Sequence, residues 1–251
     1  MRVLILLPPS ETKAAGGDGT PLELDRLSFP ELNGGRKQLA DDLVALAADL
    51  PASRASLGVS VRQDAEIERN AMLWTSPTSP ALHRYTGVLY DALDYRSLRG
   101  ASAARATARL AVGSALFGLV RAADPVPAYR LSASSTLPGR PGLQAFWRPL
   151  LEPVLHEIGE LVVDLRSGAY QALCRVPGAV TVNVLTERPD GSRTVISHFN
   201  KAHKGRVARL LASSRAEPTE ARDVVRLLRR AGSHIETGDP GGTALELIIA
   251  E

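Results

Sequence analysis

Cysteine is almost absent from this 251-residue sequence, in which Cys174 is the only one. One cysteine excludes an intrachain disulfide framework and any zinc or iron–sulfur site that needs several thiolates. The five histidines show no metal-ligand spacing such as H-E-x-x-H, and the sequence contains neither a G-x-S-x-G elbow nor a dinucleotide-binding fingerprint. The sequence therefore predicts no metal centre and no bound cofactor.

Long hydrophobic runs are also missing. No apolar stretch approaches the roughly 18 to 20 residues that a membrane-spanning helix needs. The apolar run at residues 3–7 is too short for the central region of a signal peptide, and charged residues soon follow it. Since 44% of the residues are hydrophobic, a sizeable core is available, and we expect a globular cytoplasmic protein with no membrane partner.

Positive charge is concentrated in two segments, although the net charge is only +3. Residues 99–148 contain seven arginines and one acid, and residues 193–230 contain ten lysines or arginines and three acids. These segments carry +6 and +7, which leaves −10 for the rest of the chain. This polarity predicts one basic surface that binds phosphates, although solvated helix faces in an arginine-rich protein would give the same counts.

Strand-like and helical segments alternate along the chain. Apolar runs at residues 1–7, 109–117, 161–163 and 245–249 predict buried strands, and helical spacing predicts helices over residues 39–50, 149–158, 201–212 and 219–231. The turn sequence at residues 189–192, Pro-Asp-Gly-Ser, predicts a hairpin of residues 180–185 and 194–199. An antiparallel hairpin in such a mixture favours a mixed α/β (α+β) fold over a doubly wound sheet. Because no repeat or linker divides the chain, we expect one domain, residues 1–251.

The loop at residues 8–13, Pro-Pro-Ser-Glu-Thr-Lys, follows the first predicted strand. Loops at the carboxyl ends of strands commonly line ligand crevices in α/β proteins. Only four of the 30 basic residues are lysine, so Lys13 is an exception in a sequence that favours arginine. An ammonium group binds phosphate as a point charge, and it becomes a base or nucleophile when burial lowers its pKa. Ser10 and Lys13 are therefore candidate phosphate contacts and Lys13 a candidate catalytic residue; a solvated loop lysine is the alternative.

A second polar segment, residues 114–131, contains two arginines, an acid and a tyrosine between prolines. Arginine forks bind phosphate with two hydrogen bonds, and a tyrosine ring offers a stacking face for a base. Arg121 and Arg130 are therefore candidate phosphate contacts, and Asp124 and Tyr129 are candidates for proton transfer. The alternative is that one of the arginines pairs with Asp124 and only fixes the loop.

A third segment, residues 200–209, is the best candidate for phosphate contact. On a helical wheel, Lys201, Lys204, Arg206 and Arg209 fall around one broad side, and Val207 falls on the other. The free N–H groups at the amino terminus of the helix add to the attraction for anions. A basic but merely solvated helix face is the competing interpretation.

These segments, together with several others, resemble those of the YaaA family of peroxide-stress proteins, and they occur in the family's order. Residues 85–90, Tyr-Thr-Gly-Val-Leu-Tyr, match its Y-T-G-x-x-Y, and residues 114–131 are similar to its S-G-L-Y-G-V-L-R-P-x-D-x-x-x-P-Y-R-L. Residues 8–13, 146–147, 165–170 and 200–209 resemble its S-P-A-K-T, F-W, L-A-S-x-E-Y and A-K-K-A-R-G-x-x-x-R motifs. Arg166 and Ala169 depart from the pattern, because the family has a small residue and an acid there.

The resemblance implies a single mixed α/β fold with a positively charged cleft and a helix-hairpin-helix-like element. It also implies binding to duplex or structured DNA and a role in limiting oxidative damage that is linked to intracellular iron. The residues leave open an enzyme that acts on a nucleotide or another phosphorylated small molecule, with Lys13 in its active site. A third hypothesis is that the arginine clusters serve only solubility or oligomer contacts.

Overall fold

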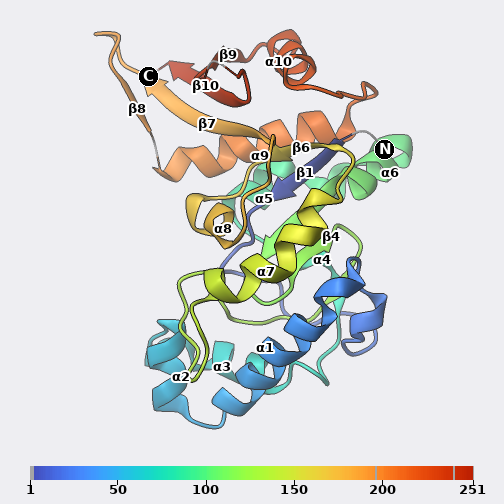
Figure 1. Ribbon diagram of the computed structural model, residues 1–251, viewed down its shortest axis with the longest axis vertical. Coiled ribbons are helices and arrows are strands. Elements are labelled where there is room, and N and C mark those ends of the chain that lie inside the picture. The colour runs from blue at the N-terminus through green and yellow to red at the C-terminus, as the bar shows by residue number, and fades with distance from the viewer. Residues whose placement is uncertain (1–2, 196, 240, 251) are drawn as a thin grey trace.

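A computed structural model describes residues 3–250 except 196 and 240, and its core is a mixed β-sheet (Figure 1). Within these residues, eight strands form the sheet in the order β4-β3-β1-β6-β7-β10-β9, with β8 paired to β7. The strands are β1 (Val3–Leu7), β3 (Leu110–Ser114), β4 (Gly118–Arg121), β6 (Leu161–Asp164), β7 (Val180–Glu187), β8 (Arg193–Val195), β9 (His234–Thr237) and β10 (Ala244–Ala250). A small second sheet pairs β2 (Ser79–Pro80) with β5 (Pro125–Val126).

The centre of the main sheet is parallel, and its antiparallel strands flank that centre. β1 pairs in parallel with β3 and β6, β6 with β7, and β7 with β10. β4, β8 and β9 pair antiparallel with β3, β7 and β10. All five residues of β1 are buried, as expected for a parallel strand that is covered on both faces. The predicted mixed α/β fold is therefore confirmed.

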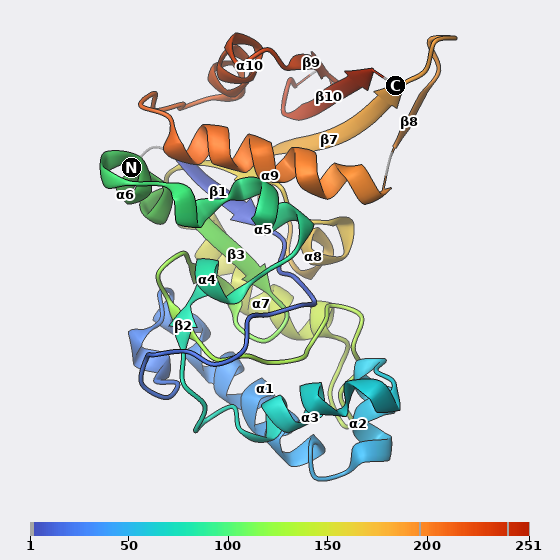
Figure 2. The same cartoon turned by 180° about the vertical axis from the view of Figure 1, so that it is seen from behind.

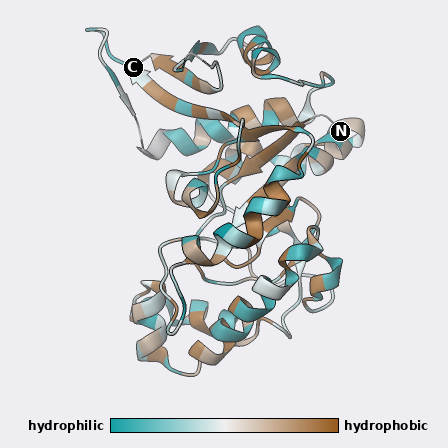
Figure 3. Cartoon of the chain, in the orientation of Figure 1, coloured by the Kyte–Doolittle hydropathy of each residue, from teal (hydrophilic) through white to brown (hydrophobic). Residues whose placement is uncertain are grey.

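Helices cover both faces of the sheet. In Figure 2, α5 (Val88–Leu93), α6 (Gly100–Arg109) and α9 (Ser197–Ser213) lie in front of the strands, and in Figure 1, α7 (Leu143–His156) and α8 (Gly168–Leu173) lie on the other side. Both views place α1 (Asn33–Leu46), α2 (Leu50–Leu57) and α3 (Asp64–Ala71) at the end of the molecule opposite β9, β10 and α10 (Ala221–Arg230). The short helix α4 (Ala81–Arg84) follows β2. Figure 3 shows the strands as mainly apolar, whereas α9 and α10 alternate between apolar and polar residues.

Most predicted elements are present, with shifted ends. The hairpin of β7 and β8 is confirmed, but residues 197–199 belong to α9 rather than to its second strand, and residue 196 lies outside the described residues. The helix predicted over residues 39–50 is α1, which ends at Leu46. Pro51 instead occupies the first turn of α2. The N–H that proline lacks would have no carbonyl partner within the helix at that position. In the part of the chain described here, no helix is both long and apolar enough to cross a membrane.

The buried arginine Arg36 braces the interior through carbonyl groups. Arg36 donates to the carbonyls of Ser28, Phe117 and Leu119 at 2.8, 3.0 and 2.6 Å, which ties α1 to the turn between β3 and β4. Burial lowers the pKa of Arg36 to about 10. A buried guanidinium is tolerated here because its N–H groups have acceptors.

Candidate functional site

The loop after β1 is held in place by its pairing with the segment that follows α4. An isolated antiparallel bridge joins Lys13 to Tyr85, and the Ala14 N–H donates to the Arg84 carbonyl at 2.8 Å. The buried Arg84 guanidinium donates in turn to the carbonyls of Ala14 and Gly16. The backbone on both sides of Lys13 is therefore fixed, and the residue is only 7% exposed.

The Lys13 side chain lies against a cluster of hydroxyl groups at the carboxyl end of β3. Its amine is 4.1 Å from the centre of the Tyr129 ring and 5.7 Å from that of Tyr85, which are cation–π distances. The Tyr129 hydroxyl is 2.7 Å from Ser114 Oγ and 2.9 Å from the Tyr85 hydroxyl. Burial raises the pKa of Tyr85 to about 12 and that of Tyr129 well above its ordinary value, so both rings keep their protons.

The charge of Lys13 is poorly compensated. Its amine donates to the Ser10 carbonyl at 3.0 Å, and it forms no ion pair with a carboxylate among the described residues. Burial lowers the pKa of Lys13 to about 8; the negative charge of Glu11 opposes this shift and the positive charge of Arg130 adds to it. A lysine with this pKa is partly neutral near pH 8, and the neutral amine is the nucleophilic form.

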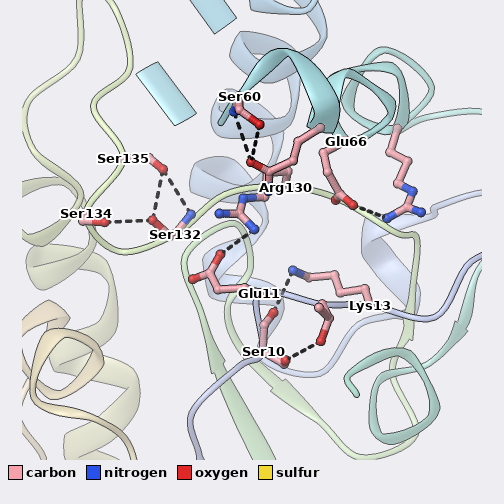
Figure 4. Close-up of polar contacts among 12 residues, drawn as sticks. Ser10, Glu11, Lys13, Ser60, Glu66, Arg130, Ser132, Ser134 and Ser135 are labelled. Atoms are coloured by element: carbon pink, nitrogen blue, oxygen red, sulfur yellow. Dashed lines mark hydrogen bonds and ion pairs between the residues drawn. The ribbon is translucent and has the colours of Figure 1, made fainter. Parts of the chain in front are cut away.

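Arg130 and Glu11 form an ion pair beside the Lys13 amine. Figure 4 shows the three side chains together, with 3.0 Å between the Arg130 guanidinium and the Glu11 carboxylate. The Asn70 side chain anchors the Arg130 backbone: its Oδ1 accepts from the Arg130 N–H at 2.8 Å, and its Nδ2 donates to the Arg130 carbonyl at 2.9 Å. The Arg130 side chain is 15% exposed and that of Glu11 is 50% exposed, so a largely covered, fixed cation faces a carboxylate that solvent can reach. Next to them, Arg69 pairs with Glu66 at 2.7 Å.

Four of the predicted site residues therefore lie together, namely Ser10, Lys13, Tyr129 and Arg130. Asp124 is not part of the cluster: its carboxylate accepts hydrogen bonds from Ser28 N, Ser28 Oγ and Arg121 N at 3.0, 2.8 and 2.9 Å. No contact joins it to Lys13 within the described ranges. The carboxylate fixes the turn after β4, although the partner that it engages is the Arg121 backbone rather than a guanidinium.

Arg121 lies at the opposite end of β3 from the Lys13 cluster. Its guanidinium donates to the Ala108 carbonyl at 3.1 Å and lies 3.8 Å from the Glu160 carboxylate. Ala108 comes just before β3, whereas Ser114 of the hydroxyl cluster is the last residue of that strand. The antiparallel register of β3 and β4 produces this separation, because β4 runs back from the Ser114 end toward the start of β3.

The cations of α9 do not share one side of the helix, so that prediction is wrong. Lys204 donates inward to the carbonyls of Leu165 and Arg166 at 3.3 and 3.4 Å. Arg209 donates to the carbonyls of Leu93 and Asp94 at 2.9 and 2.6 Å. Lys201 and Arg206 are exposed. Positions 204 and 206 are about 200° apart on a helix, so their side chains leave on nearly opposite sides.

Arg206 lines a separate groove between α9 and α10. The groove has a volume of about 550 Å³, and the strand β10 contributes to its lining. His203 and His234 also line it, over an apolar floor that includes Leu228 and Ile248. Burial and the positive charge of Arg206 lower the pKa of His203. The structure thus places the predicted site residues at separate locations: Ser10, Lys13, Tyr129 and Arg130 form the Lys13 cluster, whereas Arg206 lies at the α9–α10 groove.

Several residues of the Lys13 cluster were not among the predicted site residues. Tyr85 and Ser114 complete the hydroxyl chain, and the Tyr90 ring stacks on Tyr85 at 5.6 Å while its hydroxyl donates to the Pro8 carbonyl at 2.8 Å. The Y-T-G-x-x-Y motif contains both tyrosines, so the sequence carried a signal for them. Only the fold shows that they lie against Lys13.

Arg166, where the sequence departs from the YaaA pattern, is a buried structural residue. It pairs with Asp164 at 2.8 Å, and the same guanidinium donates to the Cys174 carbonyl at 2.9 Å. Its side chain packs over Gly113, where an added Cβ would lie 2.7 Å from Arg166 Cδ. The large residue at position 166 thus fits because position 113 has no side chain.

Comparison with known proteins gives consistent matches over most of the chain. The family model described as peroxide stress protein YaaA matches residues 3–229. A UPF0246 protein of Corynebacterium efficiens is 48% identical over 98% of this chain and 100% of its own length. UPF0246 proteins of Corynebacterium glutamicum and Streptomyces coelicolor are 46% and 42% identical over 98% and 99% of this chain.

Proposed function

Because this chain belongs to the peroxide stress protein YaaA family, we propose that its part in the stress response is an enzymatic reaction at Lys13. The substrate would be a nucleotide or another phosphorylated small molecule. The observation that carries the proposal is that one buried amine lies over the rings of two tyrosines, whose hydroxyls contact each other, and beside an anchored arginine. A poised amine, proton donors and an anion-binding group are the parts that a reaction of this kind needs.

Each residue has a distinct role in this proposal. Lys13 is the nucleophile or base, since burial shifts it toward its neutral form. Tyr129 and Tyr85 keep their protons and are the proton donors. Arg130 binds the phosphate of the substrate. Asp124 has no role, because its carboxylate is occupied by Ser28 and Arg121.

Calorimetric titration with AMP, ATP and ribose 5-phosphate tests this proposal. We expect at least one of them to bind wild type, and Arg130→Met to weaken its binding by tenfold or more, since about 1.4 kcal/mol corresponds to tenfold and a charged hydrogen bond contributes about as much or more. Arg62→Met, which changes an exposed arginine on the surface, is the control and should bind as wild type does. Absence of binding by all three compounds, or equal binding by Arg130→Met, would contradict the proposal.

DNA binding is a second candidate, and the exposed cations near the α9–α10 groove favour it. Lys201 and Arg206 make no ion pair with any described residue, and Arg206 lines the groove. Further exposed arginines lie in this part of the chain: Arg215 precedes α10, and Arg222, Arg226, Arg229 and Arg230 belong to it. Lys204, Arg209 and Arg121 contact carbonyl groups or a carboxylate of the protein itself, and Arg130 belongs to the Lys13 site, so DNA binding does not depend on these four residues.

Fluorescence anisotropy with a labelled duplex, measured over a series of salt concentrations, tests DNA binding. Contacts to phosphate make affinity fall steeply with salt and depend little on sequence. Lys201→Ala/Arg206→Ala should lower the slope of log affinity against log salt by about 2, roughly one for each lost phosphate contact. Lys37→Ala, on α1 at the other end of the molecule, is the matched control. An unchanged slope in the double variant would remove this candidate.

A further inference from the structure

The hydroxyl cluster has one hydrogen more than its contacts use. Ser114 Oγ accepts from the N–H groups of Leu116 and Phe117 at 3.2 and 3.0 Å, so both of its lone pairs are occupied. Its own hydrogen must therefore go to the Tyr129 oxygen, 2.7 Å away. The second contact, between Tyr129 and Tyr85, uses one of the two tyrosine hydrogens. The other has no acceptor among the described residues, and it belongs to a ring that the Lys13 amine faces.

The Lys13 amine can supply a free lone pair, which complements this spare hydroxyl hydrogen. The Ser10 carbonyl takes one of its hydrogens, and its remaining surroundings are aromatic faces and the Arg130 charge. Burial and the positive charge of Arg130 favour an amine with a free lone pair over a charged ammonium, against the opposing attraction of the ring faces and of the Glu11 charge. A nucleophilic nitrogen thus lies beside a spare proton donor, which is the pair of groups that addition to a carbonyl requires.

The Arg130–Glu11 pair marks where the charged end of such a molecule would bind. Arg130 is fixed by Asn70, whereas Glu11 belongs to the loop after β1 and half of its side chain is exposed. The buried Nε of Arg130 has no hydrogen-bond partner within the described residues. An incoming carboxylate or phosphate can therefore take the place of Glu11 and use a donor that Glu11 leaves unsatisfied.

We propose that Lys13 condenses with an aldehyde that carries a carboxylate or phosphate, and that this anionic group replaces Glu11 at Arg130. The proposal rests on the enzymatic function at Lys13 and specifies its substrate class. The neutral amine attacks the carbonyl carbon and forms the C–N bond, while the carbonyl oxygen takes the spare tyrosine proton. A proton from the nitrogen restores the tyrosine. The carbinolamine then loses water, made from its hydroxyl and the last amine hydrogen, and leaves an imine.

Reductive trapping tests the proposal, because sodium cyanoborohydride converts an imine to a stable secondary amine. Wild type is incubated at pH 7.5 with glyoxylate, with glycolaldehyde phosphate, or with acetaldehyde as the probe that has no anionic group, and labelled lysines are quantified by peptide mass spectrometry. The chain has only four lysines, so Lys37, Lys201 and Lys204 are internal controls. We expect Lys13 to be labelled roughly tenfold or more faster than Lys37 by the anionic aldehydes, because a larger fraction of it is neutral.

Two variants make the result specific. Arg130→Met should lower labelling of Lys13 by the anionic probes by tenfold or more and leave labelling of Lys37 unchanged. Labelling of Lys13 by acetaldehyde should fall much less, because this probe loses only the effect of the Arg130 charge on the pKa of Lys13. Glu11→Gln should raise labelling of Lys13 by the anionic probes, since the competing carboxylate is removed; circular dichroism confirms that both variants are folded. Even labelling of all lysines, or labelling of Lys13 that ignores Arg130, overturns the proposal. If the phosphorylated compounds bind through Arg130 but Lys13 is not trapped, the imine is wrong and the proposed function stands.

Discussion

The Lys13 amine lies 4.1 Å from the centre of the Tyr129 ring, in a place where the folded chain offers it a carbonyl and aromatic faces but no carboxylate at ion-pair distance among the described residues. Burying an ammonium group in this way costs free energy, and the protein lowers that cost by favouring the neutral amine. The same contacts that make Lys13 unfavourable for stability make it chemically useful.

The stability of the protein should depend on pH through Lys13. The pKa of Lys13 in the folded protein is about 8, below its ordinary value of 10.5, so between these pH values the unfolded state binds more protons. The free energy of unfolding should therefore rise with pH across that window, by roughly 2 to 3 kcal/mol if the full shift is realised. Lys13→Met should be more stable than wild type at pH 7, and the difference should shrink as the pH rises to 9.5.

Urea unfolding at pH 7, 8, 9 and 9.5 measures this difference. The series stops at pH 9.5 because of the buried tyrosines. Their pKa values are raised in the folded protein, so at higher pH they would lower the free energy of unfolding, opposite to the effect of Lys13. Lys37→Met, at an exposed position, corrects for the general loss of a lysine. A constant difference between wild type and Lys13→Met across the series would contradict the prediction.

The hydroxyl cluster predicts an order of destabilisation among its conservative variants. Ser114→Ala leaves two buried N–H groups without an acceptor and removes one of the two contacts of the Tyr129 hydroxyl, and should cost the most, about 2 to 4 kcal/mol. Tyr129→Phe leaves the Ser114 hydrogen and the Tyr85 hydroxyl without a partner but keeps the acceptor of the two N–H groups, and should cost about 1 to 3 kcal/mol. Tyr85→Phe should cost the least, since it lies at the end of the chain of hydroxyls. Chemical unfolding of the three variants gives the order, and a larger loss for Tyr85→Phe than for Ser114→Ala would refute the arrangement.

The crossing of α5 and α9 should tolerate only glycine at position 205. An added Cβ would lie 2.2 Å from the Leu89 carbonyl oxygen and 2.8 Å from Ala92 Cβ, so the helices would have to separate. Gly205→Ala should therefore destabilise the protein by about 1 to 3 kcal/mol or more. Gly34→Ala is the matched control in α1, where nothing lies within 4 Å of the new Cβ, and it should be neutral or stabilising by up to about 1 kcal/mol. Equal thermal stability of the two variants would rule out the close approach.

The buried guanidinium of Arg84 should be irreplaceable by lysine. It serves the carbonyls of Ala14, Gly16, Pro77 and Val126, and an ammonium group cannot reach all four from one position. Arg84→Lys should lose at least about 2 kcal/mol, because buried carbonyls are left without donors. Arg222→Lys, on the exposed face of α10, should change stability by less than about 0.5 kcal/mol. Thermal unfolding of both variants makes the comparison, and a mild effect of Arg84→Lys would show that the loop after β1 has another anchor.

The sequence predicted the fold class well because its signals are local. The apolar run of β1 and the turn between β7 and β8 specify their structures without reference to the rest of the chain. The end of α1 was misplaced because Pro51 stops one helix and suits the first turn of another equally well. Only the observed spacing of the two helices resolves that ambiguity.

The site was less predictable because it depends on which segments meet. Lys13, Tyr129 and Arg130 were chosen for their chemistry, and the structure brings them together. Arg121 has the same chemistry as Arg130 but lies at the other end of β3, because the antiparallel register of β3 and β4 places it there. Whether an arginine faces a ligand or a carbonyl depends on contacts between distant segments, and residue type alone does not determine them.

A titration of the Lys13 amine by NMR tests the central claim most directly. With only four lysines in the chain, selective labelling of lysine gives few signals, and Lys13→Arg identifies the one that matters. The account predicts that the Lys13 signal titrates near pH 8, where burial has moved its pKa. A Lys13 signal that titrates near the ordinary value of 10.5 would contradict it.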